Sequence, residues 1–207
     1  MASIGLLGIK IGMTQIFNKV GHTIPVTILQ IGPCFITEIK TIEKHGYQAI
    51  QVGYHKVQNK VLTKAEFGHL TKHDLPALKY LKEFHIVNPH KFNTGQNIKI
   101  TELKVGEFID VQGKSIGKGF TGYQKRHKFT RGPMSHGSKN HRKPGSIGAG
   151  TTPGRVFPGK KMAGRTGHKQ VTIRNLEIID IKQQDNIILV KGSVPGKIGN
   201  LISIKNK

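Results

Sequence analysis

Acidic residues are scarce in this sequence, and one long stretch has none. Only 11 of the 207 residues are Asp or Glu, against 33 Lys and Arg. The 58 residues from 113 to 170 contain no acid but fourteen Lys and Arg, which is +14 of the formal net charge of +22. Buried charge must be paired, and nothing inside this stretch can pair these cations. The stretch therefore cannot form an ordinary core and requires an external polyanion, of which a nucleic acid is the obvious candidate.

Cysteine and long apolar runs are also lacking. The single cysteine, Cys34, excludes an internal disulfide and a cysteine-based zinc site, and its neighbours Pro33, Phe35 and Ile36 predict that it is a small buried hydrophobe. No apolar run reaches the roughly 18 residues of a membrane span. The first residues lack the basic region and apolar stretch of a signal peptide, so we expect the protein to act where it is made.

Short strand patterns lie on both sides of the acid-free stretch. They cover residues 24–31, 35–42, 47–54, 98–103, 108–111, 171–181, 187–190 and 201–204. Between 63 and 84 the period changes. Thr63 and Glu66 have capping-box spacing, and Leu75, Leu78 and Leu81 recur at intervals of three, which predicts two short helices.

These patterns predict a mainly β protein with one β domain, formed by residues 1–112 and 171–207 as a closed barrel, with a helical insertion at about 60–85. Residues 113–170, called here the basic arm, contain thirteen of the 26 glycines, four prolines and only scattered apolar residues. Such a segment cannot bury enough surface to offset its chain entropy, so we expect it to be largely disordered when alone. A long loop of this kind is normally functional.

The glycines at 117, 119 and 122 match the G-x-G-x-x-G letters of a dinucleotide site. Such a site also needs a helix that opens at the last glycine and an acid about 20 residues further on. The continuation has no apolar helical face, and the next acid is Glu177. Glycines that let the backbone approach a phosphate chain closely explain the same letters better.

The histidines of the basic arm predict neither a metal site nor a hydrolase. His136 and His141 lie five residues apart, and no Cys or carboxylate completes a ligand set. Ser135 adjoins His136, but no acid in the basic arm can orient the imidazole. Base stacking or hydrogen bonds to phosphate suit imidazoles in this basic context better.

Four aromatic residues, Phe120, Tyr123, Phe129 and Phe157, are interleaved with the cations. They can stack on unpaired bases, or they can form small clusters that hold the bends of the arm, and the sequence leaves both interpretations open. Outside the basic arm, Lys10, Lys56, Lys60 and Lys191 are either solubilising surface residues or further nucleic-acid contacts.

Several motifs resemble the large-subunit ribosomal protein L3 family, bacterial type, and together they cover essentially the whole chain. They are GLLGIKIGMT at 5–14, GKSIGKGF at 113–120 followed by Lys125-Arg126, SHGS at 135–138, HRKPGSIG at 141–148, FPGKKMAG at 157–164 and KGSVPG at 191–196. The long central motifs are highly specific, unlike the three-glycine pattern taken alone.

The resemblance implies a six-stranded barrel of the translation-protein type on the outer side of the subunit, with a small helical insertion. It implies an arm that threads into 23S-type rRNA toward the peptidyl transferase centre, an early role in subunit assembly near the 3′ end of that RNA, and contacts with the L14 and L19 families. It implies no catalytic activity, cofactor, metal, membrane or small-molecule substrate.

Charge and resemblance together predict a set of rRNA-binding residues in the basic arm. These residues are Lys114, Lys118, Phe120, Tyr123, Lys125, Arg126, His127, Lys128, Arg131, His136, Lys139, His141, Arg142, Lys143, Arg155, Lys160, Lys161, Arg165, His168 and Lys169.

Two features concern the origin of the chain and its modification. Ala149 stands where several bacterial members carry a glutamine that is methylated on its amide, so that modification cannot occur there. Lysine outnumbers arginine 27 to 6, and Ile and Asn are plentiful, which suits an AT-rich genome. We expect a ribosome of the plastid stroma, or alternatively of a bacterial cytoplasm.

Two functions from other classes stay open. A DNA-compacting protein would bind duplex DNA as well as structured RNA, although a basic amphipathic helix or helix-turn-helix pattern is missing. An enzyme would use the barrel as a scaffold and the glycine loop for a nucleotide, which the acid-free loop disfavours.

Overall fold

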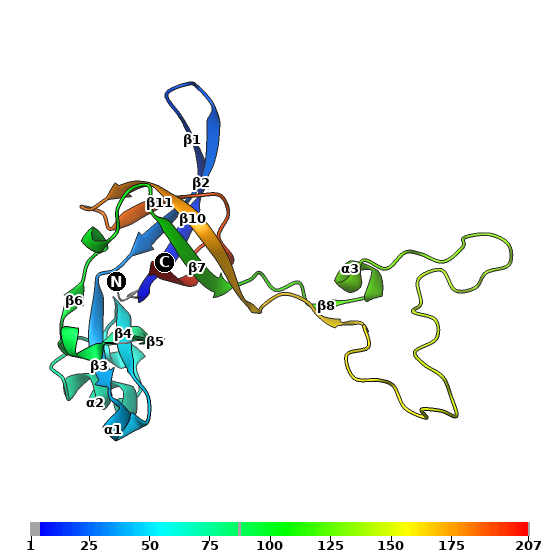
Figure 1. The fold of residues 1–207 in the computed structure, drawn as a ribbon, viewed down its shortest axis with the longest axis horizontal. Coiled ribbons are helices and arrows are strands. Elements are labelled where there is room, and N and C mark those ends of the chain that lie inside the picture. Colours follow the sequence, from blue (N-terminus) through cyan, green and yellow to red (C-terminus); the bar gives the residue numbers. More distant parts are fainter. Residues whose placement is uncertain (1–4, 87, 207) are drawn as a thin grey trace. The chain divides into compact units, whose positions relative to one another are not determined.

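Six antiparallel strands close into a barrel in the computed structural model, which describes residues 5–86 and 88–206 (Figure 1). In order around the barrel they are β1 (Gly5–Phe17), β12 (Leu201–Asn206), β7 (Phe108–Lys114), β10 (Gln170–Lys182), β11 (Ile187–Lys191) and β2 (Thr23–Ile31). The pairing of β2 with β1 closes the barrel. The predicted fold class, mainly β with a closed six-stranded barrel, is confirmed. Residues 1–4, 87 and 207, which the prediction included in the barrel domain, lie outside the described residues.

A second antiparallel sheet has four strands in the order β5 (Leu78–His85), β4 (Ala49–Lys56), β3 (Cys34–Lys40) and β6 (Asn97–Ile98). The sequence patterns at 35–42 and 47–54 predicted these strands but placed all strands in one barrel. The remaining elements are short: α1 (Ile42–His45), α2 (Lys64–Thr71), α3 (Tyr123–His127), the 3₁₀ turns η1 (Asn59–Val61), η2 (Pro89–Lys91) and η3 (Ile100–Glu102), and the strands β8 (Phe120–Thr121) and β9 (Gly164–Arg165). None of the helices in the described ranges is long and apolar enough to cross a membrane.

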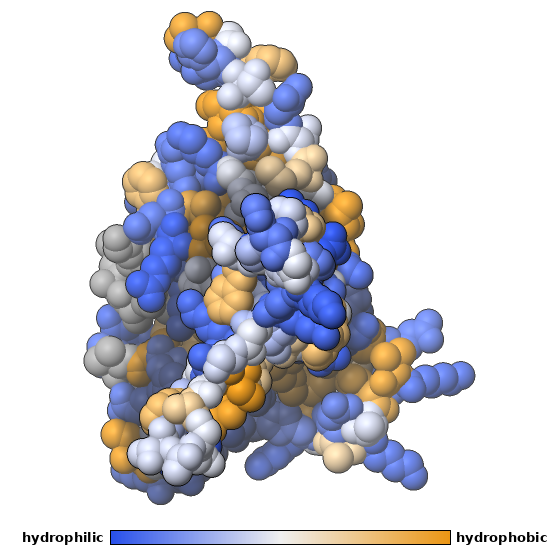
Figure 2. Space-filling model, turned by 90° about the vertical axis from the view of Figure 1, so that its right-hand side faces the viewer, coloured by the Kyte–Doolittle hydropathy of each residue, from blue (hydrophilic) through white to orange (hydrophobic). Residues whose placement is uncertain are grey.

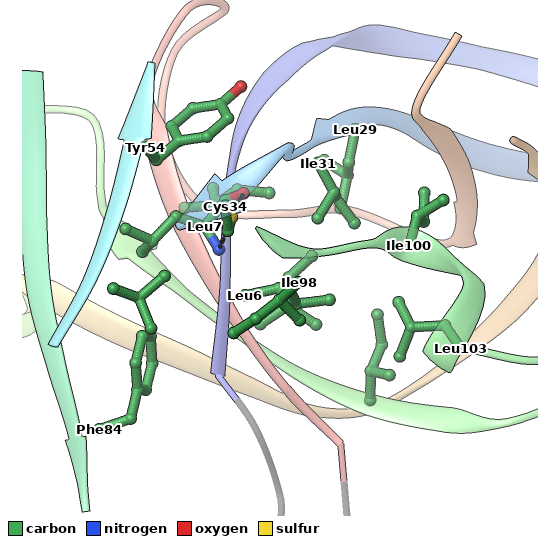
Figure 3. Packing of buried hydrophobic residues seen from close by; sticks show 14 of the residues in the cluster. Leu6, Leu7, Leu29, Ile31, Cys34, Tyr54, Phe84, Ile98, Ile100 and Leu103 are labelled. Atoms are coloured by element: carbon green, nitrogen blue, oxygen red, sulfur yellow. Dashed lines mark hydrogen bonds between the residues drawn. The ribbon is translucent and has the colours of Figure 1, made fainter. Parts of the chain in front are cut away.

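The barrel and the second sheet share one hydrophobic core (Figure 3). Leu7 and Leu29 from the barrel, Cys34 from β3 and Phe84 from β5 belong to the same buried cluster. The contact is close at Gly5, where a Cβ atom would overlap the ring of Phe84. The two sheets therefore pack as one body, because their inner faces cover each other's apolar side chains.

The chain divides into two compact units. The first contains Met1–Lys114 and Gln170–Lys207, and the second contains Ser115–Lys169. All buried side chains that form the hydrophobic clusters belong to the first unit. The second unit, Ser115–Lys169, has no buried residue, so it must be held by other means.

The helix expected from Leu75, Leu78 and Leu81 is wrong, because β5 occupies Leu78–His85. Seven residue pairs join it to β4, among them Tyr80 opposite Tyr54. Leu78 packs in a small cluster with Leu70 and Leu75, on which Leu81 also packs, whereas Phe84 lies on the face that enters the core shared with the barrel. Lys82 lies on that face, and this charged residue hides the apolar alternation that identifies a strand.

The other predicted helix is confirmed as α2. Thr63 caps it: the Thr63 side chain accepts a hydrogen bond from the Glu66 backbone N–H, and the Glu66 carboxylate accepts one from the Thr63 N–H at 3.0 Å. The strand predicted at 98–103 is mostly wrong. Pairing ends at Ile98, and the 3₁₀ turn η3 follows, which places both Ile100 and Leu103 in the core.

Cys34 is fully buried, as predicted, and its thiol exchanges hydrogen bonds of 3.4 Å with the Leu7 backbone N–H and carbonyl. Burial raises the pKa of the thiol to about 11. An unfolded chain ionises its thiol near pH 8.5, so between about pH 9 and about pH 11 the folded state binds the extra proton. The free energy of unfolding should then fall as the pH rises, by at most about 1.4 kcal/mol per pH unit from this group.

Urea unfolding across this pH range measures the effect, with Cys34→Ala as the comparison. The alanine variant has no thiol to titrate, so its free energy of unfolding should fall less steeply with pH. Equal slopes for the two proteins would show that Cys34 titrates alike in both states.

Candidate nucleic-acid interface

The second unit begins and ends as a two-stranded ribbon. The Ser115 N–H donates to the Lys169 carbonyl at 2.9 Å, and the Lys118 N–H donates to the Thr166 carbonyl at 2.9 Å. Strand β8 then pairs with β9. These bonds join neutral backbone groups, so the ribbon forms without bringing ionised groups together.

A second connection fixes the end of the ribbon. The guanidinium of Arg126 donates to the Met162 carbonyl at 2.7 Å, and His127 Nε2 lies 2.9 Å from the same oxygen. A side chain at Gly164 would overlap the Arg126 guanidinium, so the glycine makes room for this contact. Helix α3 supplies both residues and ends at His127, and the next residue, Lys128, has a left-handed φ of 60°.

The four aromatic residues predicted to matter in the second unit have two kinds of surroundings. Tyr123 stacks on Phe129 with ring centroids 6.4 Å apart and planes inclined by 14°, and His127 lies 5.7 Å from the same Phe129 ring. Phe120 and Phe157 are instead 78% and 58% exposed. Tyr123 and Phe129 therefore support a bend of the arm itself. Phe120 is open to solvent, and Phe157 is exposed with the Arg155 guanidinium over its ring, 6.0 Å from the centroid.

Beyond α3 the chain is irregular and is held by isolated bonds. The Gly132 N–H donates to the His141 carbonyl at 3.0 Å, and His141 Nδ1 lies 2.8 Å from the Pro133 carbonyl. His136 adopts a left-handed φ of 58°. Only a few such contacts hold residues 128–161, so the predicted disorder of the free arm stays a prediction about the isolated chain.

The predicted rRNA-binding residues differ in exposure. Sixteen are exposed: Lys114, Lys118, Phe120, Lys125, Lys128, Arg131, His136, Lys139, Arg142, Lys143, Arg155, Lys160, Lys161, Arg165, His168 and Lys169. Four are half-buried, namely Tyr123, Arg126, His127 and His141. These four are the ones that make the internal contacts described above, so they shape the arm as well as carrying donors or rings.

No residue of the second unit forms an ion pair with any described residue. The four ion pairs within the described part of the chain all lie in the first unit. On the face drawn in Figure 2, hydrophilic residues cover most of the surface and hydrophobic residues occur in small separate groups. The cations of the second unit thus lack a carboxylate partner among the described residues, and all of them except Arg126 are exposed.

The glycine pattern at 117–122 forms part of the ribbon. The Thr166 N–H donates to the Gly119 carbonyl at 2.9 Å, and the five-residue helix α3 opens after Gly122 without a capping side chain. Strand β8 before it has only two residues, so the local structure is a hairpin and not the strand–helix–strand unit of a dinucleotide site. Among the described residues, no group of three or more His, Cys, Asp or Glu side chains is placed to hold a metal ion.

The lysines outside the basic arm have different roles. Lys10 Nζ donates to the carbonyls of Val194 and Gly196 at 2.7 and 3.2 Å, and burial lowers the pKa of its ammonium. Lys191 pairs with Glu177 at 3.2 Å, and Lys56 lies over the Phe35 ring. Lys60 is exposed. Lys10 therefore stabilises a turn of the barrel unit and does not belong to a free basic surface.

Fold and charge together define a class: a closed β-barrel protein with a coreless cationic insertion between two neighbouring barrel strands. Comparison with known proteins identifies the family. The family model for ribosomal protein L3 matches residues 35–187. The chain belongs to the ribosomal protein L3 family.

The curated relatives agree over nearly the full length. The chain is 62% identical to the large ribosomal subunit protein uL3c of Gracilaria tenuistipitata var. liui, which covers 97% of this chain and 98% of the relative. It is 60% identical to the uL3c protein of Phaeodactylum tricornutum, with 97% of each chain covered. It is 56% identical to the uL3 protein of the cyanobacterium Trichormus variabilis, with 98% and 96% covered.

Lys125 and Arg126 are adjacent cations with different surroundings, which gives a matched test of the ribbon. Arg126→Gln removes the bond to Met162, so amide exchange at 120–127 and 162–166 should become faster by roughly fivefold, the equivalent of about 1 kcal/mol. Lys125→Gln removes the same charge from an exposed side chain and should leave these amides unchanged. Hydrogen-exchange mass spectrometry of both variants measures this, and equal effects would show that charge alone controls the ribbon.

Proposed function

We propose that this protein is a structural constituent of the large ribosomal subunit and that it binds the large-subunit rRNA directly through its basic arm. One observation carries the proposal: fourteen cations lie on a segment without a single acid, and no residue of the second unit is buried or ion-paired with a described residue. Membership of the ribosomal protein L3 family and the names of the relatives support RNA, and the ribosome in particular, as the polyanion.

The proposed mechanism is coupled neutralisation and ordering. The ribbon at 115–121 and 164–169 holds the two ends of the second unit together, while the chain between them keeps most of its backbone groups for RNA. Phosphate contacts release condensed counterions, and this release drives the ordering of the arm. Phe120 is exposed and can stack on an unpaired base, and Arg155 over the exposed Phe157 ring can join a stack of the same kind. Specificity then comes from RNA shape and looped bases, because side chains cannot read the deep major groove of A-form helices.

Three finer statements belong to the same proposal and rest on family resemblance. The protein joins the subunit early and promotes its assembly, its arm extends toward the peptidyl transferase centre, and its neighbours include proteins of the L14 and L19 families. The uL3c relatives favour a plastid ribosome in the stroma, and the cyanobacterial relatives favour the alternative of a bacterial cytoplasm. Ala149 removes the amide that would be methylated, so assembly does not depend on that modification here.

The two other functional classes receive less support. A DNA-compacting protein would bind duplex DNA as well as structured RNA, and membership of the ribosomal protein L3 family supports RNA instead. A nucleotide-using enzyme would need an acid for the ribose near the glycine pattern, and the basic arm has none. We therefore assign the protein a structural and not a catalytic role.

Neutralising two exposed arm lysines tests the electrostatic part of the proposal. With about eight phosphate contacts, the logarithm of the rRNA binding constant should fall against the logarithm of salt with a slope of roughly −6 to −7. Lys160→Gln with Lys161→Gln should make this slope shallower by roughly 1.5 and weaken binding. Filter binding over a salt series measures both quantities.

The matched control removes two exposed lysines from the first unit, Lys44→Gln with Lys72→Gln, and has the same net charge. It should keep the wild-type slope, and circular dichroism should show the barrel folded in both variants. Equal losses in the two double variants would contradict a role for the arm lysines.

Crosslinking the protein to total cellular RNA tests the choice of partner. Sequencing of the attached fragments should recover large-subunit rRNA, concentrated at sites linked to the basic arm. Recovery of diverse RNAs in proportion to their abundance, or preferential binding of duplex DNA in competition, would contradict the ribosomal assignment and favour an architectural protein.

A further inference from the structure

A pocket of about 680 Å³ lies in the first unit between the edge strand β5 and the barrel strands β7 and β12. Its size is in the range of sites that hold a small organic ligand. The side chains that give it chemical character are Tyr80 and Lys82 from β5, Gln112 and Lys114 from β7, Asn200 from the preceding turn and Ser203 from β12. None of these side chains is acidic. Lys114 is the one among them that the sequence analysis predicted to bind rRNA.

Lys82 is the central charge of this pocket. Its Nζ donates to the Gln112 side-chain oxygen at 2.9 Å and to the Ser203 hydroxyl at 2.7 Å. An ammonium has three N–H donors, so among the described residues one donor remains for a ligand. Burial lowers the pKa of Lys82, and the neighbouring charge of Lys205 lowers it further. Burial and the like charge of Lys205 both disfavour the charged form of Lys82, so an anion bound beside it would stabilise the ammonium.

The acids nearest to the pocket do not line it. Asp110 of β7 lies opposite Lys205 of β12 in the strand register and accepts a hydrogen bond of 3.0 Å from the Asn175 N–H. Glu83 follows Lys82 in β5, so its side chain lies on the opposite face, where it accepts a hydrogen bond of 2.8 Å from the Tyr47 hydroxyl. Lys82 and Lys205 both lie over the ring of Phe84, at 5.8 and 5.9 Å from its centroid. Lys82 and Lys114 line the pocket with no carboxylate among the described lining residues, and this makes a positive potential that an anion would relieve.

The wall of the pocket is fixed before any ligand binds. The Asn200 side chain donates to the Lys114 carbonyl at 3.1 Å, and the Asn200 carbonyl accepts from the Lys10 N–H at 3.1 Å. Lys10 also holds the turn through the Val194 and Gly196 carbonyls. A site with fixed walls loses little entropy on binding, which favours a specific ligand over a loose contact.

We infer that this pocket binds a single unstacked nucleotide of an RNA strand, with its phosphate at Lys82 and Lys114 and its base against the Tyr80 ring. The inference rests on the proposed function, because the strand is the rRNA of that proposal. Amide groups of Gln112 and Asn200 offer both donors and acceptors, which suit the polar edge of a base. A phosphate alone would not need an aromatic wall, and an apolar ligand would not tolerate two cations.

Ultraviolet crosslinking followed by mass spectrometry tests this inference on the full chain reconstituted with large-subunit rRNA. A nucleotide adduct is expected on peptides that contain Tyr80 and Lys82 or residues 199–203. In Lys82→Met, which keeps the length of the side chain, this adduct should fall at least fivefold. Lys99→Met removes an exposed charge of the same unit that does not line the pocket, and should leave the adduct unchanged.

Adducts on the basic arm serve as the internal reference. If arm adducts persist while the pocket peptides carry none, the inference is overturned and the proposed function stands. If the arm itself carries none, the proposed function fails. If the pocket instead binds a segment of a neighbouring protein, arm adducts should persist and the pocket peptides should carry no nucleotide.

A second variant distinguishes a loss of binding from misfolding of Lys82→Met. Lys114 is exposed, so Lys114→Gln should leave the thermal unfolding midpoint unchanged and still reduce the pocket adduct. An undiminished adduct in both variants would overturn the assignment of the two lysines.

Discussion

Fourteen like charges on one segment repel each other, and nothing in the chain is arranged to cancel them. The second unit accordingly has no buried residue and no ion pair with the described chain, and its fixed portion depends on neutral backbone hydrogen bonds between 115–121 and 164–169. Stability has to come from the barrel and its companion sheet, whose shared core lies in the first unit. The molecule thus keeps its buried core in the first unit and its acid-free cationic stretch in the second.

Lysine has three different tasks in this structure. Lys10 holds the carbonyls of a turn, Lys82 lies half-buried among neutral polar groups, and Lys160 faces solvent on the arm. Composition cannot distinguish these tasks, because each depends on what surrounds the ammonium. The acid-free stretch was informative for a different reason, since a complete absence of acids excludes ion pairing within the segment whatever its conformation.

Much of the first unit could be predicted from local patterns. The barrel strands follow β-branched runs, and the Thr63–Glu66 spacing gave α2 because a capping box is a local device. Strand β5 could not be predicted, since its strand character depends on pairing with β4 and on an inward lysine that breaks the apolar alternation. The contact of Arg126 with Met162 spans 36 residues, and no pattern marked it beyond the glycine that makes room. The second sheet escaped prediction for the same reason, because strand order is a property of tertiary packing.

Lys114 and Gln170 face each other as a register pair of β7 and β10, so the chain departs from the barrel and returns to it at adjacent positions. Topologically, the whole basic arm is the turn of a β-hairpin. The closure entropy of such a turn grows only slowly with its length, by about 0.6 kcal/mol per doubling. The length of the basic arm therefore has little effect on the stability of the barrel, so the arm can become longer or shorter during evolution while the barrel stays the same.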